Sequence, residues 1–146
     1  MTRIDFYVEA RDRIEVACRL AAKAVQARTR MLVYAPDESM VTRIDRQLWT
    51  QSPTGFLPHC MSHDPLAAET PILIARNVDD PPVDDVILNL ADTFPPTFAR
   101  FRRVLEIVSR DPQDKALARD RFRFYRDRGY RIETHNLGEP VDRSPG

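Results

Sequence analysis

The opening of the chain constrains the fold most, because a strand pattern is followed at once by a helix pattern. Ile4, Phe6 and Val8 alternate with polar or amphipathic neighbours, which is the period-two pattern of a strand. From Asp12 to Ala27 apolar residues recur at three- and four-residue steps, the pattern of a helix with one buried face. A strand followed by such a helix predicts the beginning of a βαβ unit.

The alternation of strand and helix patterns continues along the chain. Short apolar runs at 31–35, 72–75, 86–90 and 104–108 have the character of strands buried on both faces, and 131–134 can add a short closing strand. The predicted fold class is therefore α/β: a single-domain, Rossmann-like, mostly parallel sheet with helices on both faces.

Two more helices are indicated by their end signals. Asp37 is a suitable cap for a helix with apolar residues at 40, 44 and 48. Asp111 precedes Pro112, which suits the first helical position, and Gly129 suits a stop, so a helix is predicted over 112–128.

The length of 146 residues suits one domain, which we assign to residues 1–137. Residues 138–146 contain two prolines and little to bury, so a flexible C-terminal tail is expected there. No apolar run has the length of a membrane span, and the residues after Met1 do not resemble a signal peptide. We therefore expect a cytoplasmic protein without membrane partners.

Motifs for catalysis or cofactor binding are absent from the sequence. The turn after the first strand reads Glu9-Ala10-Arg11-Asp12 and lacks the glycines of a phosphate-binding loop. No nucleophile elbow, P-loop or zinc-protease pair occurs, so no catalytic residues and no cofactors are predicted. His59, Cys60 and His63 form a weak metal-ligand pattern, which we interpret as an ordinary loop without a metal.

The strongest charge asymmetry lies in the last helix, although the whole chain balances 22 basic against 22 acidic residues. Lys115, Arg119, Arg123 and Arg126 share one helix face, and Phe122 falls at its border with the apolar face. Such a surface suits an acidic peptide that ends in an apolar side chain. The alternatives are a solvated helix face and a site for nucleic-acid phosphates.

A second candidate surface contains the only tryptophan. Trp49 and Phe56 flank a turn-forming Ser-Pro-Thr-Gly segment. These aromatic residues either pack into the core, which is the usual outcome, or anchor a partner protein.

Several separated segments resemble the chi subunit family of the bacterial DNA polymerase III holoenzyme. They are the opening Asp5-Phe6-Tyr7-Val8, the pair Leu48-Trp49 followed by Phe56-Leu57-Pro58-His59, the stretch 115–126, and Gly129-Tyr130. Their shared order is more specific than any one of them.

The resemblance implies a non-catalytic adaptor that joins single-stranded DNA-binding protein to the clamp loader and meets nucleic acid only indirectly. The family's pocket for the acidic, phenylalanine-ended tail of single-stranded DNA-binding protein would correspond to Val108, Lys115, Arg119, Phe122 and Arg123. Phe122 and Arg123 stand where the best-known relatives have Tyr and Lys.

The surface that faces the clamp loader, through a psi subunit or an equivalent partner, would correspond to Trp49 and Phe56. Two other functions remain as alternatives: a nucleotide- or phosphate-binding enzyme on a degenerate Rossmann-like fold, and a protein that binds nucleic acid directly.

Overall fold

The computed structural model describes residues 1–50 and 57–138. The chain begins with β1 (Arg3–Ala10) and α1 (Arg13–Gln26), as the opening pattern predicts. Asp12 caps α1 by accepting hydrogen bonds from the backbone N–H groups of Ile14 and Glu15. The predicted βαβ beginning is therefore confirmed.

The elements that follow are β2 (Met31–Tyr34), α2 (Glu38–Thr50), β3 (His59–Met61), η1 (Ala67–Glu69), β4 (Ile72–Ala75), β5 (Val86–Asn89), η2 (Phe98–Arg100), β6 (Arg103–Ser109), α3 (Pro112–Asp127) and β7 (Arg131–Asn136). The two η elements are short 3₁₀ turns in the connections. Within the described residues the strands form one sheet of seven, in the order β3-β4-β2-β5-β6-β1-β7, and every pair is parallel. The single α/β domain of Rossmann-like class is confirmed.

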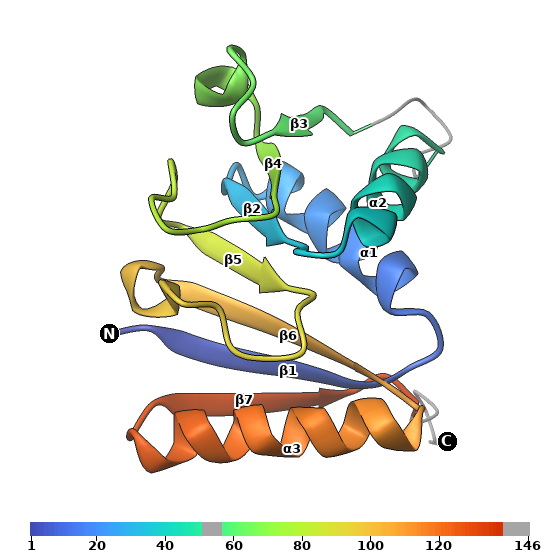
Figure 1. The fold of residues 1–146 in the computed structure, drawn as a ribbon, viewed down its shortest axis with the longest axis vertical. Coiled ribbons are helices and arrows are strands. Elements are labelled where there is room, and N and C mark those ends of the chain that lie inside the picture. Colours follow the sequence, from blue (N-terminus) through green and yellow to red (C-terminus); the bar gives the residue numbers. More distant parts are fainter. Residues whose placement is uncertain (51–56, 139–146) are drawn as a thin grey trace.

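The core is divided by the sheet into two layers, and the alternation of strand side chains separates them. On β6, Leu105 and Ile107 pack with α1 and α2, whereas Val104 and Val108 pack with α3. Figure 1 shows α3 lying along β7, away from α1 and α2. Helices on both faces, as predicted, follow from strands that are apolar on both sides.

The connections around β4 and β5 contain no α-helix within the described part of the chain. Residues 76–85 and 90–102 run as loops with one 3₁₀ turn. Each connection contains a proline pair, at 81–82 and 95–96. Proline lacks the backbone N–H and restricts the residue before it, so these segments cannot form a helical crossover. Buried loop residues such as Val78, Phe98 and Phe101 cover the sheet there instead.

The last helix and strand differ slightly from their predicted bounds. Asp111 caps α3 through the N–H of Gln113 at 2.9 Å, and Pro112 occupies the first turn. The helix ends at Asp127, one residue before the predicted end, and Gly129 follows in the left-handed region at φ 83°. β7 continues to Asn136 because it pairs with β1 along its whole length.

The C-terminal tail expected over 138–146 lies outside the described residues from position 139 onward. Among the helices at 1–50 and 57–138, none has both the length and the apolar character that crossing a membrane requires.

Candidate functional site

The sequence-predicted surface on α3 borders a pocket of about 280 Å³ between this helix and β1, β6 and β7. Of the five residues that the resemblance assigned to peptide binding, four line the pocket: Val108, Lys115, Arg119 and Phe122. The other lining residues are Phe6, Val8, Glu9, Ala118 and Thr134.

The sheet and the helix both contribute to this pocket because of their periodicity. Phe6 and Val8 point to the same side of β1, and on α3 the lining residues recur at three- and four-residue steps. The rings of Phe6 and Phe122 are tilted against each other at 5.4 Å. Phe122 is half-buried, as predicted from its position at the border of two faces. The pocket thus has an apolar floor and cations at its rim.

One rim cation already contacts a carboxylate. Lys115 Nζ lies 2.6 Å from Glu9 Oε2, and Arg110 Nε lies 3.9 Å from the other oxygen. The hydrogen bond from Lys115 lowers the pKa of Glu9 below its usual value. Glu9 has a left-handed backbone with φ 62°, which is unfavourable for a residue other than glycine. Sequence reasoning treated Glu9 only as a turn residue and missed its place in the pocket.

Arg123 and Arg126 share the basic face of α3 but lie outside the pocket. Arg123 pairs with Asp120 at 3.5 Å, and Arg126 pairs with Asp127 at 3.0 Å. The cationic arc predicted from the helix wheel therefore extends past the pocket, and only part of it borders the apolar floor.

Arg121 differs from the other arginines of α3, because it is buried and paired. Its Nε donates to Glu106 Oε1 at 2.8 Å, and one terminal nitrogen donates to the carbonyl oxygen of Asp92. Tyr125 and Asn89 donate to the other oxygen of Glu106. The charge of Arg121 is thus compensated inside the domain and does not add to the basic surface of α3.

The second predicted surface is described only in part, because Phe56 lies outside the described residues. Trp49, near the end of α2, is 54% exposed and meets the ring of His59 edge-on at 5.6 Å. Of the two alternatives for this residue, burial in the core is therefore excluded.

His59 belongs to a strand and not to the expected loop. It begins β3, and its ring nitrogens lie 2.8 Å from Asp45 Oδ1 and 2.6 Å from the Leu57 carbonyl oxygen. These contacts attach the edge strand to α2. His63 is exposed, and the described residues do not bring it together with His59 and Cys60 as a metal-ligand group.

The turn after β1 is unsuited to a phosphate group. In nucleotide-binding relatives of this fold class, glycines there let phosphate reach the helix N-terminus. Here the carboxylate of Asp12 already accepts from the first N–H groups of α1. The carboxylate of Glu9 stands on the same turn and would repel a phosphate.

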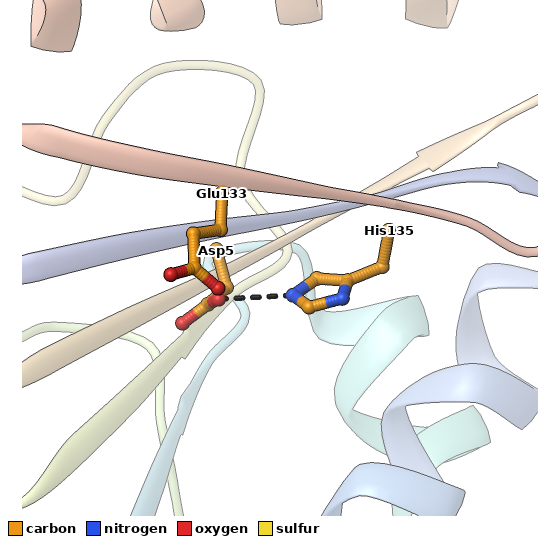
Figure 2. A group of neighbouring side chains, drawn as sticks. All are labelled: Asp5, Glu133 and His135. Atoms are coloured by element: carbon orange, nitrogen blue, oxygen red, sulfur yellow. Dashed lines mark hydrogen bonds and ion pairs between the residues drawn. The ribbon is translucent and has the colours of Figure 1, made fainter.

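A group of possible metal ligands, which sequence reasoning missed, lies on the sheet face opposite α3. Asp5, Glu133 and His135 have ligand atoms within 4.8 Å of one another, on β1 and β7 (Figure 2). Asp5 is fully buried and already accepts from Arg3, Arg103 and His135. Burial opposes its ionisation, but the hydrogen bonds from His135 and Arg103 lower its pKa. Two guanidinium groups in contact with this carboxylate make the site unfavourable for a metal cation.

Taken together, these features define a Rossmann-like α/β domain with an apolar, cation-rimmed pocket in place of a nucleotide site. Comparison with known proteins narrows this class. The family described as "DNA polymerase III chi subunit, HolC" matches residues 1–133. The chain is also 36% identical over 143 residues to the DNA polymerase III subunit chi of Pseudomonas aeruginosa, covering 94% of this chain and 98% of that protein.

Two other relatives carry the same name. The protein from Haemophilus influenzae is 30% identical over 128 residues, with 85% of this chain and 87% of the relative covered. The protein from Escherichia coli is 26% identical over 121 residues, with 82% of each chain covered. The chain therefore belongs to the DNA polymerase III chi subunit family, whose members are accessory subunits in DNA replication and not catalytic ones.

Proposed function

We propose that this chain is an adaptor in DNA replication that binds the acidic C-terminal tail of single-stranded DNA-binding protein through the α3 pocket. Through the surface around Trp49 and Phe56 it would hold a clamp-loader component, either a psi subunit or an equivalent partner. It would act in the cytoplasm, where bacterial DNA is replicated. No cofactor or metal is needed for this role, because both activities are binding of protein surfaces.

The observation that carries the proposal is the convergence of Val108, Lys115, Arg119 and Phe122 on one pocket. An apolar floor offers burial to the terminal phenylalanine ring of the tail. Lys115 and Arg119 at the rim offer charge-assisted hydrogen bonds to its carboxylates. Because Arg123 is exposed beside this rim, we assign it to steering the acidic tail rather than to direct contact within the pocket.

The position of Trp49 supports a second, separate interface. α2 and α3 pack on opposite faces of the sheet, so partners at the two surfaces would not collide. A half-exposed tryptophan is a frequent anchor of protein interfaces.

The test of the tail-binding site is calorimetric titration with a peptide that matches the tail. Arg119→Glu places a negative charge at the pocket rim, and we expect its affinity to fall by about tenfold or more, equivalent to ~1.4 kcal/mol. Arg126→Glu is the matched control, since it makes the same change on the same helix outside the pocket. A peptide that lacks the terminal phenylalanine should not bind measurably to either variant.

Equal losses in the two variants would mean that only the overall charge of α3 matters and would contradict the pocket. Undiminished binding of the tail peptide by Arg119→Glu would exclude the pocket as its site. For the second interface, Trp49→Ala should abolish co-purification with the clamp-loader component and leave tail affinity unchanged.

A further inference from the structure

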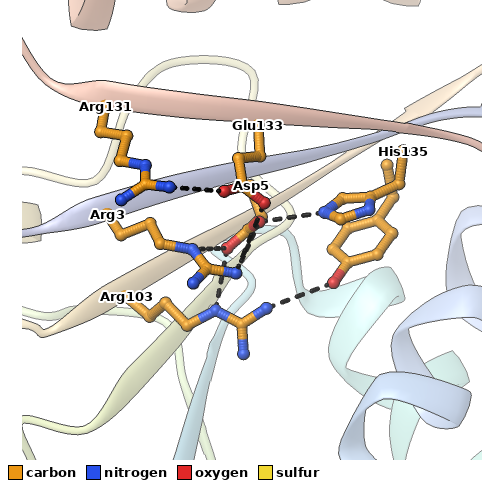
Figure 3. A network of polar contacts seen from close by, with 7 residues as sticks. Arg3, Asp5, Arg103, Arg131, Glu133 and His135 are labelled. Atoms are coloured by element: carbon orange, nitrogen blue, oxygen red, sulfur yellow. Dashed lines mark hydrogen bonds and ion pairs between the residues drawn. The ribbon is translucent and has the colours of Figure 1, made fainter.

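The face of the sheet opposite α3 carries a row of arginines at the amino ends of three neighbouring strands. Arg131 on β7, Arg3 on β1 and Arg103 on β6 are partners in the strand register, so their side chains project from the same face (Figure 3). The next residues on β1 and β6, Ile4 and Val104, face the α3 layer instead. Neighbouring strands lie about 4.8 Å apart, which sets the spacing of the row.

Carboxylates beneath the row hold its guanidinium groups in place. Asp5, fully buried, lies 2.8 Å from Arg103 Nε and 3.3 Å from Arg3 Nε. Glu133 lies 3.3 Å from a terminal nitrogen of Arg131. Arg3 and Arg103 nevertheless remain 42% and 37% exposed, so each keeps N–H groups for another anion. Three guanidinium groups against two carboxylates leave positive charge at the surface.

A pocket of about 500 Å³ continues from this row toward the end of α1. Four arginines line it, Arg3, Arg28, Arg102 and Arg103, against one carboxylate, Asp85. Arg28 and Arg102 are exposed and form no ion pair with any residue in 1–50 or 57–138. These two cations are thus available to a ligand. We call this pocket and the row beside it the arginine groove.

The backbone at Arg28 supports a use for its side chain. The N–H of Arg28 bonds to the Val25 carbonyl oxygen, and the N–H of Thr29 bonds to that of Ala24. This pair of hydrogen bonds ends α1 in a left-handed residue, a position usually taken by glycine. Arg28 adopts it at φ 57°. The Arg28 side chain leaves the end of α1 at the wall of the pocket, beside the other arginines that line it.

We propose that the arginine groove binds the phosphate groups of a single-stranded nucleic acid. Guanidinium groups match phosphate oxygens in charge and geometry. The rings of Tyr7 and His135 stack at 4.5 Å and 15° beside the row, and His135 is 38% exposed, so a flat surface is present for a base. Among the residues that the structure describes, Val86 is the single apolar one that lines the pocket, which offers little to the apolar side chains of a peptide. These features favour a nucleic acid over an acidic protein segment.

The test is fluorescence anisotropy with a labelled oligothymidylate at several salt concentrations. Each lost phosphate contact lowers the slope of log K against log salt by about 0.7 for single strands. The double variant Arg28→Ala/Arg102→Ala should therefore bind more weakly at low salt, with a slope smaller by about 1.4. Arg43→Ala/Arg46→Ala is the matched control, because it removes two exposed arginines of α2.

Absence of oligothymidylate binding by the unaltered chain, or equal effects of the two double variants, would overturn the proposal. Displacement of the oligothymidylate by a polyglutamate peptide at equal charge concentration would reassign the groove to acidic proteins. The Arg119→Glu variant should still bind the oligothymidylate, since that residue lies on the other face of the sheet. This outcome separates the groove from the tail pocket, on which the inference does not depend.

Discussion

The buried ion pair between Glu106 and Arg121 attaches α3 to the sheet, and we predict that Arg121→Met strongly destabilises the domain. Glu106 is fully buried on β6, and the side chain of Arg121 is 2% exposed. The substitution keeps an unbranched stem but shortens the side chain, and it removes both the charge and the hydrogen-bond donors. Since α3 carries the pocket residues, this pair positions the proposed peptide site.

The size of the destabilisation by Arg121→Met depends on which hydrogen bonds the Glu106 carboxylate retains. Removing one partner of a buried ion pair costs about 3–5 kcal/mol. Glu106 would keep hydrogen bonds from Tyr125 and Asn89, and burial already raises its pKa, so protonation can relieve part of the penalty. We therefore expect a loss near the lower limit, about 3 kcal/mol. At roughly 2–4 °C per kcal/mol for a domain of this size, Tm should fall by roughly 6–12 °C.

The measurement is urea unfolding of the full chain. The loss should appear as a lower midpoint concentration of urea, while the slope of the unfolding free energy against urea concentration stays unchanged. Arg123→Met is the control, because Arg123 is exposed on the same helix, and it should stay within about 0.5 kcal/mol of the unaltered chain. The double variant Glu106→Gln/Arg121→Met should lose less than the sum of the single variants, because each single variant leaves one buried charge unpaired and the double variant leaves none. Additive losses, or a loss for Arg121→Met no larger than that of the control, would refute the assignment.

Three further predictions concern Asp5, Glu9 and Trp49. Because the folded state holds the pKa of Asp5 below its ordinary 3.8, its contribution to stability is present above that pH and is lost as pH falls through the folded value. Asp5→Asn should therefore lower Tm at pH 7, and the difference from the unaltered chain should shrink in thermal melts near pH 3 if His135 and the arginines act through the carboxylate. Glu9→Gln should raise affinity for the acidic tail peptide in calorimetry, because it releases Lys115 from a competing carboxylate; unchanged affinity would mean that Glu9 does not compete. Trp49→Ala should leave Tm almost unchanged in a thermal melt because the side chain is half exposed, and a large fall would mean that its role is structural.

The local part of the fold could be predicted because its signals lie close together in the sequence. The capping aspartates of α1 and α3 act on N–H groups two or three residues away. The strand patterns of β1 and β6 are readable from a few residues. Four pocket residues were predicted together because three of them recur on one helix and the family resemblance added Val108.

The parts that could not be predicted depend on pairing between distant segments. Asp5 meets Arg103 and His135 at separations of 98 and 130 residues, and only the register of β1 with β6 and β7 brings them together. The burial of Arg121 could not be predicted from the pattern of α3 alone, because its partner Glu106 lies within an apolar run on another element. β3 was missed because three residues are too few to give a periodic pattern.

The alternation of side chains along β1 connects the two proposed anion sites. Phe6 and Val8 line the tail pocket on one face, whereas Asp5 and Tyr7 support the arginine groove on the other. Ligands on opposite faces are separated by the sheet and by the side-chain layers that cover it. Solvent-exposed charges that lie farther apart than the Debye length, about 8 Å at physiological salt, are largely screened from each other. An acidic tail and a nucleic-acid strand should therefore bind together at physiological salt, and weaken each other only at low ionic strength.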